Sequence, residues 1–218
     1  MATGKINLLV VDDDELLCET LSEICAHRGH GVRTAMDGFS ALGEIRHRRP
    51  QLLISDLHMP GMSGYELLSV VRRRFPAMRV IAMSSMQGDD GMPAGIAADH
   101  YYEKNGSFTV LLEMIDTIAK TSARRERESR RYGNRHATLQ APLWVARNGH
   151  NPSGESYVTL TCPECLRTFP QALDGSSRQI HRTGCVHCHN EVDFAIVQPQ
   201  HPVDLQARAT SARGLAQA

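Results

Sequence analysis

Four short apolar segments in the first half of the chain each end in a polar residue, and this pattern constrains the fold most strongly. Nearly continuous apolar runs are typical of parallel strands that are buried on both faces. Because ligands bind at the carboxyl ends of the strands in an open α/β sheet, we expect the polar residues to share one crevice. They are Asp12, Asp13 and Asp14 after residues 6–11, Asp56 after 52–55, Ser84 after 80–83, and Lys104 after 101–102.

The segments between these runs show the 3.6-residue spacing of helices, and a fifth strand is predicted at residues 31–35. Five strand–helix pairs in residues 1–122 predict right-handed crossovers and a doubly wound, five-stranded parallel sheet. The fourth helix is expected to be short, distorted or mobile, because glycine and proline are unfavourable in a helix interior. Its segment contains Gly88, Gly91, Pro93 and Gly95.

The motifs at residues 8–15, 55–64, 84–85 and 101–104 resemble those of receiver domains of bacterial two-component response regulators. The resemblance covers residues 4–122, about half of the chain, and implies a flavodoxin-like fold. It implies that Asp56 accepts a phosphoryl group from a sensor histidine kinase or phosphotransfer protein. Asp12 and Asp13 would hold Mg²⁺ with Asp56 and the backbone carbonyl of His58. Ser84 and Lys104 would contact the phosphoryl oxygens, and Ser84 and Tyr101 would form the conformational switch.

The residue types suit this chemistry. An aspartate nucleophile is already ionised at neutral pH and needs no base. Crowded carboxylates repel one another, and Mg²⁺ relieves the repulsion because it prefers oxygen ligands. Phosphoryl transfer depends on positioning and on charge neutralisation, which a lysine and a hydroxyl supply. The competing interpretation of the aspartate triplet alone is helix capping, because carboxylates favour helix N-termini.

Two positions depart from the usual receiver pattern. Asn105 follows Lys104 where the family has a proline whose peptide bond is cis. Because a cis bond before a non-proline residue costs about 2.5–4 kcal/mol, we predict a trans bond or backbone strain there. Ser84 replaces a more usual threonine and keeps the hydroxyl group.

Residues 123–155 form a basic linker, with seven arginines against two glutamates in residues 123–150. This segment either prolongs the last helix as a solvated rod or serves as an arm that binds nucleic-acid phosphates. The apolar stretch at residues 142–145 contains the only tryptophan and is expected to pack the linker onto a neighbouring domain.

The second strong signal is two Cys-x-x-Cys pairs, Cys162 with Cys165 and Cys185 with Cys188, separated by 19 residues. This spacing fits a four-cysteine Zn²⁺ site, and strand-like segments flank the pairs. Residues 156–198 resemble zinc ribbons, a small β fold. Because so short a segment cannot bury a large core, metal binding is expected to supply much of its folding free energy.

Three other readings of the cysteines are weaker. Disulfides are rare in cytosolic proteins, and the redox type of Cys-x-x-Cys motif usually lies in a βαβ setting. Covalent haem attachment at Cys185, Cys188 and His189 would leave the first pair unexplained. Residues 199–218, which have few large apolar side chains, are expected to be a flexible tail.

The sequence therefore predicts a cytoplasmic response regulator with a receiver at 1–122 and a zinc-ribbon output at 156–198. The output would dock a protein partner or bind nucleic acid, or the chain would act as a phosphoryl sink. The net charge is zero, no stretch is long and apolar enough to span a membrane, and no independent enzyme domain is recognisable. Whether phosphorylation produces a dimer is left open.

Overall fold

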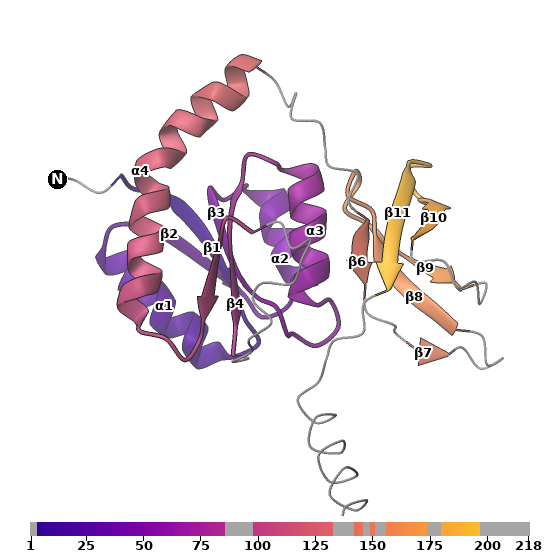
Figure 1. Cartoon of the computed structure of the whole chain (residues 1–218), viewed down its shortest axis with the longest axis horizontal. Coiled ribbons are helices and arrows are strands. Elements are labelled where there is room, and N and C mark those ends of the chain that lie inside the picture. The colour runs from indigo at the N-terminus through magenta and orange to yellow at the C-terminus, as the bar shows by residue number, and fades with distance from the viewer. Residues whose placement is uncertain are drawn as a thin grey trace, which may run out of the picture.

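The computed structural model of the protein describes residues 4–85, 98–132, 142–145, 149–150, 156–173 and 180–196. Figure 1 shows an α/β domain beside a smaller C-terminal β domain. None of the helices in these segments is long and apolar enough to cross a membrane. The elements of the α/β domain are β1 (Asn7–Val11), α1 (Glu15–His27), β2 (Gly31–Ala35), α2 (Gly38–His47), β3 (Leu52–Asp56), α3 (Gly64–Arg74), β4 (Arg79–Ser84), β5 (His100–Glu103) and α4 (Phe108–Tyr132).

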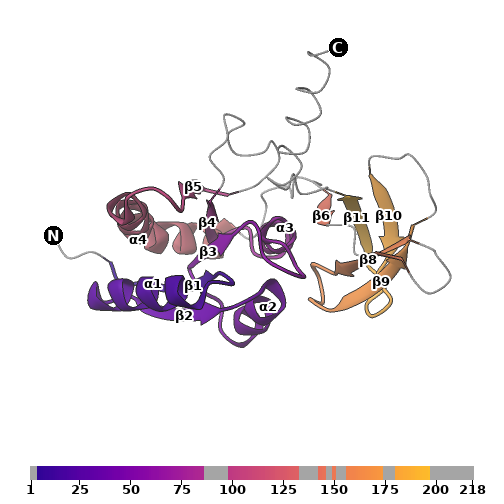
Figure 2. The ribbon, with the colours of Figure 1, turned by 90° about the horizontal axis from the view of Figure 1, so that it is seen from below.

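The five strands form one parallel sheet in the order β2-β1-β3-β4-β5, which confirms the predicted doubly wound architecture. Figure 2 shows α1 and α4 on one face of this sheet and α2 and α3 on the other. The strand order reverses between β1 and β3, and such a switch point opens a crevice at the carboxyl ends of the strands.

Alternation along the strands divides the core into two layers. Leu8 and Val10 of β1 pack with α1 and α4, whereas Leu9 and Val11 pack with α2 and α3. All four side chains are fully buried, as expected of a strand covered on both faces.

Short polar side chains determine where the helices begin. The Asp14 carboxylate accepts a hydrogen bond from the main-chain N–H of Leu17 at 3.2 Å and caps α1. The Ser63 hydroxyl caps α3 in the same way, and the Ser107 hydroxyl caps α4. Each cap satisfies an N–H group that has no partner within the helix.

Helix α4 continues past the sheet to Tyr132. The first part of the arginine-rich segment is therefore a prolongation of the last helix, one of the two alternatives that the sequence left open. The predicted irregular fourth helix (residues 86–97) and the flexible tail (199–218) both lie outside the described residues.

The C-terminal β domain contains two small sheets, β10-β11-β6 and β7-β8-β9. Their strands are β6 (Leu143–Val145), β7 (Gly149–His150), β8 (Ser156–Thr161), β9 (Thr168–Ala172), β10 (His181–Gly184) and β11 (Glu191–Ile196). Strand β6 pairs in parallel with β11, and β7 pairs with β8, so the segment assigned to the linker from sequence contributes two strands to this domain. The prediction that residues 142–145 pack against a neighbour is confirmed, because Leu143 and Val145 are fully buried.

The two domains share one continuous apolar core. Strand β6 packs against α3, and Trp144 donates its main-chain N–H to the Ser69 hydroxyl of that helix at 3.4 Å. Apolar residues on the α2 and α3 side of the large sheet and apolar residues of the C-terminal domain belong to the same buried cluster, which includes Leu67, Val71, Leu143, Val158, Leu160 and Phe194. Helix α3 is therefore the element through which the domains contact each other.

A carboxyl group lies buried in this contact. Glu66 of α3 is only 6% exposed and lies beside Thr161, and its Oε1 atom has no hydrogen-bond partner among the described residues. Burial raises the pKa of Glu66 to about 8, because the neighbouring Thr161 offsets only part of the desolvation. Glu66 is therefore mainly protonated in the docked state at neutral pH.

The raised pKa of Glu66 predicts a dependence of stability on pH. The folded state keeps a proton that the unfolded chain releases above pH 4.5, so stability falls as pH rises from 4.5 to about 8. We expect Glu66→Gln to remove this slope and to raise the free energy of unfolding at pH 8 by on the order of 2–4 kcal/mol. Urea unfolding of zinc-loaded protein between pH 6 and 8.5 measures the slope. The exposed Glu113→Gln is the control, and an unchanged slope in Glu66→Gln would contradict the assignment.

Candidate functional site

The predicted polar residues meet at the carboxyl ends of β1, β3, β4 and β5. The Lys104 ammonium lies 2.8 Å from Asp12 Oδ2 and 2.9 Å from Asp56 Oδ2, which makes it a bridge between two carboxylates. Carboxylate oxygens of Asp12, Asp13 and Asp56 lie within 4.8 Å of one another. Asp12 and Asp56 are buried, whereas Asp13 is exposed at the rim of the site.

The charges of the site depend on one another. Burial raises the pKa of Asp12, and the hydrogen bond from Lys104 opposes this effect. Burial alone would lower the pKa of Lys104, but its hydrogen bonds to Asp12 and Asp56 outweigh burial and raise the pKa above its usual value. The ammonium group therefore stays charged and compensates for part of the negative charge in the crevice.

The three carboxylates fit a divalent cation. Asp56 Oδ1 is buried and has no hydrogen-bond partner among the described residues, as expected of an oxygen that binds a metal ion or a phosphoryl group. Hard oxygen donors at this spacing suit Mg²⁺, which binds through one or two carboxylates and keeps several waters.

The aspartate triplet divides between two tasks. Asp14 points away from the crevice and caps α1, so the capping interpretation is correct for this one residue. The Asp12 side chain accepts a hydrogen bond from the main-chain N–H of Asp14 at 3.0 Å, which orients Asp12 toward Lys104.

The remaining predicted residues border the same crevice. Ser84 is buried at the end of β4, and its carbonyl oxygen accepts the main-chain N–H of Lys104 at 2.8 Å. No peptide bond in the described segments is cis, so the bond between Lys104 and Asn105 is trans, as predicted. The half-buried Tyr101 lies in β5. His58 lies in the loop after β3, and the proposed role of its backbone carbonyl stays a prediction.

One aromatic residue near the site was not singled out from the sequence. Burial raises the pKa of Tyr65 in α3, and the nearby Tyr101 and Asp56 raise it further. The Tyr65 ring also packs edge-on against His58, with 5.7 Å between ring centroids. Only the glycine-containing turn at residues 60–64 could have placed Tyr65 near the site from sequence. This turn brings the start of α3 back toward β3.

Gly64 allows this close approach. A β-carbon at position 64 would overlap the main-chain oxygen of Asp56, so α3 begins in direct contact with the strand that carries Asp56. This contact joins the candidate phosphorylation site to the helix that supports the C-terminal domain.

We therefore expect Gly64→Ala to lower the free energy of unfolding by about 1–3 kcal/mol, the usual cost of overpacking. Gly43→Ala in α2 is a matched control, because nothing lies within 4 Å of the β-carbon it would add. This control should be neutral or gain up to about 1 kcal/mol of helix propensity. Urea unfolding measures both, and equal effects of the two changes would refute the steric argument.

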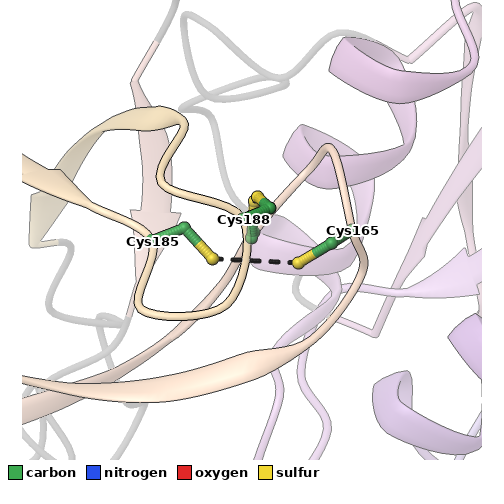
Figure 3. A group of neighbouring side chains, drawn as sticks. Cys165, Cys185 and Cys188 are labelled. Atoms are coloured by element: carbon green, nitrogen blue, oxygen red, sulfur yellow. Dashed lines mark hydrogen bonds between the residues drawn. The ribbon is translucent and has the colours of Figure 1, made fainter.

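The four predicted cysteines form the second cluster. All four sulfurs lie within 4.8 Å of one another, with 3.6 Å between Cys162 and Cys188 and 3.7 Å between Cys165 and Cys185. Figure 3 shows the sulfurs of Cys165 and Cys185 facing each other across the space between two loops. A disulfide would require about 2.05 Å, and all four thiols are free.

The two loops that carry the cysteines have the same local structure. In each loop the residue after the second cysteine donates its main-chain N–H to the carbonyl of the first, as Leu166 does to Cys162 and His189 to Cys185. Leu166 and His189 have φ values of 55° and 62°, in the left-handed region. Each backbone folds back tightly, which turns both sulfurs of a pair toward the centre of the cluster.

This arrangement fits a tetrahedral metal ion. Four thiolates at the usual Zn–S distance of about 2.3 Å have sulfur–sulfur separations of about 3.8 Å, close to those found here. Main-chain and side-chain N–H groups of His187 and Asn190 donate to Cys185 and Cys188. Burial raises the pKa of Cys162 to about 12, whereas the main-chain hydrogen bond from Asn190 lowers that of Cys188 to about 6.

The fold and the aspartate–lysine site are those of a receiver domain of signalling proteins. The family of response regulator receiver domains matches residues 8–116, and the chain belongs to this family. The probable transcriptional regulatory protein TcrX of Mycobacterium tuberculosis is 33% identical over 119 residues, which are 53% of this chain and 51% of TcrX. Protein PilG of Pseudomonas aeruginosa is 30% identical over 114 residues, which are 50% of this chain and 84% of PilG.

Solved structures show the same fold. NtrX from Brucella abortus is 26% identical with a TM-score of 0.50, over 58% of this chain and 29% of NtrX. The receiver domain of the Francisella response regulator 1452 has a TM-score of 0.51 at 24% identity, over 54% of this chain and 99% of that domain. The matched regions take in 51% of TcrX and 64% of the transcriptional regulatory protein AfsQ1 of Streptomyces coelicolor, so about half to two thirds of these relatives has a counterpart here.

Proposed function

We propose that this response regulator accepts a phosphoryl group on Asp56 from a histidine kinase or phosphotransfer protein and transmits the signal to a zinc-binding output domain. The observation that carries the proposal is the buried group of Asp12, Asp56 and Lys104, with Asp13 at its rim. Asp56 Oδ2 is held by Lys104 while Oδ1 is left for the incoming group.

Each residue has a definite task in this proposal. Asp56 attacks phosphorus through a carboxylate oxygen, the bond from phosphorus to the donor breaks, and the donor leaves with that electron pair. Lys104 and the Ser84 hydroxyl offset the charge of the phosphoryl oxygens. Asp12, Asp13 and Asp56 would hold Mg²⁺, which supplies charge neutralisation. The chain has no other proposed enzymatic activity.

For the output, we propose that the C-terminal β domain is a zinc ribbon that docks a protein partner. Its exposed Arg182 forms ion pairs with Asp193 at 2.6 Å and with Glu191 at 3.7 Å, and these pairs leave the Arg182 guanidinium unsuited to bind phosphates. The shared core with α3 supports a transmitting role over that of a simple phosphoryl sink. Nucleic-acid binding, which the names of TcrX and AfsQ1 suggest for those proteins, is the alternative.

The phosphoacceptor proposal is tested with acetyl phosphate as donor on zinc-loaded, full-length protein. We expect one phosphoryl adduct per chain, dependent on Mg²⁺ and assigned to Asp56 by peptide mass mapping. The absence of any adduct, or an adduct on a residue outside the crevice, would refute the proposal.

A further inference from the structure

A groove lies between helix α2 and the first cysteine-bearing loop. It is open to solvent and has a volume of about 390 Å³, near the lower end of the range of about 300–1,000 Å³ typical of ligand pockets. Both domains contribute to its walls, so it exists only while they are docked. It is lined by Phe39, Leu42, Gly43, Arg46, Leu166, Arg167, Thr168 and His187.

The lining combines apolar surface with cationic groups. Phe39 is 44% exposed, which is unusual for a large aromatic residue, and Leu166 is partly buried beside it in the lining. Arg46 and Arg167 are both exposed, and in the described segments neither has a carboxylate partner. The described lining residues include no acidic side chain. The groove therefore presents an apolar surface together with two guanidinium groups that have no carboxylate partner among the described residues.

The groove is also connected to both functional sites. The Phe39 ring approaches Gly61, in the loop that leads from Asp56 to α3, so that a β-carbon there would lie 3.6 Å from the ring. In the same loop, Met62 packs directly on Gly38 at the start of α2. On the other wall, Leu166 directly follows Cys165 and His187 lies between Cys185 and Cys188. The walls of the groove are therefore joined to Asp56 and to the cysteines by short stretches of chain.

We propose that this groove binds an acidic segment of a partner protein, with one apolar side chain seated between two carboxylates. The apolar side chain would pack against Phe39, Leu42 and Leu166, and the carboxylates would pair with Arg46 and Arg167. The inference rests on the proposed protein-docking function and names its site and the chemistry of the partner. The apolar, concave floor favours a protein side chain over a nucleic-acid backbone, which presents phosphates without an apolar anchor.

Two fluorescein-labelled twelve-residue peptides test the proposal: one alternates Asp with Leu, and the other alternates Lys with Leu. Fluorescence anisotropy is measured on zinc-loaded, full-length protein with and without beryllofluoride and Mg²⁺. We expect the acidic peptide to bind with a Kd on the order of 100 µM and the basic peptide not to bind. The double change Arg46→Glu with Arg167→Glu should weaken the acidic peptide by roughly tenfold or more. The same variant should gain affinity for the basic peptide.

Lys5→Glu with Lys120→Glu is the control, because both lysines are exposed and lie outside the lining, and together they change the net charge as much as the double arginine variant does. If the control lost as much affinity for the acidic peptide as the arginine variant, net charge alone would explain the loss. That result would overturn the proposal. The proposal would also be overturned if the acidic peptide did not bind. It would be overturned as well if mixed-sequence duplex DNA displaced the peptide and both variants lost affinity equally. Zinc content and acetyl phosphate labelling are measured on the same samples. If both are normal while the peptide fails to bind, the groove assignment is wrong and the phosphoacceptor proposal stands.

Discussion

We expect replacement of Asp56 with Asn to remove almost all phosphorylation of this protein by acetyl phosphate. The amide is not an effective nucleophile, and no second carboxylate takes its position, because Asp12 is held by Lys104 and by the main chain of Asp14. We expect the labelling rate to fall by at least about 100-fold, in line with losses seen when a covalent nucleophile is removed. The fold should be retained, since the change relieves repulsion between carboxylates. Intact-mass measurement over time gives the rate, and circular dichroism checks the fold.

Asp14→Asn is the matched control for this experiment. Asp14 belongs to the same acidic triplet but caps α1, a task that asparagine performs equally well. We expect its labelling rate to stay within about twofold of the unmodified protein. If Asp14→Asn lost phosphorylation as completely as Asp56→Asn, the division of the triplet between metal binding and capping would be wrong.

We expect removal of zinc to unfold the C-terminal β domain. Apparent binding free energies of structural zinc sites are about 10–16 kcal/mol, more than a small domain gains from its apolar core. We expect Cys185→Ser to lose the metal and to lose hydrogen-exchange protection in β8–β11. The α/β domain should stay folded but lose stability, because the apolar face of α3 beneath β6 becomes exposed.

Cys25→Ala is the control for the zinc experiment. Cys25 is a fully buried thiol of α1, remote from the cysteine cluster. This variant should still bind one zinc per chain, measured by elemental analysis and by release to a chromogenic chelator. Native protection of β8–β11 in metal-free protein would show that the apolar core suffices and would contradict the structural role of the metal.

The sheet and both candidate sites could be predicted from sequence because their signals are local and repeated. Each strand of the sheet has its own apolar run, and each polar end follows directly, so parallel topology brings them together. The cysteine pairs carry their own loop geometry, and their spacing suffices to predict one cluster.

The docking of the two domains could not be predicted in this way. Strand β6 has only three residues and pairs with β11, some fifty positions further along the chain, so no local pattern reveals it. Glu66 has the polarity of a surface residue and is buried only because β8 ends beside it at Thr161. The groove is formed by residues of both domains, so no local sequence pattern reveals it.

We propose that phosphorylation of Asp56 is transmitted to the C-terminal β domain through α3. Hydrogen exchange of zinc-loaded protein with and without beryllofluoride and Mg²⁺ tests it directly, with Asp56→Asn as the variant that cannot form the acyl-phosphate mimic. We expect altered exchange in the loop between β3 and α3 and also in β6 and β8, which pack beside that helix. We expect no change in the variant. A response confined to the α/β domain, with β6 and β8 unaltered, would contradict it.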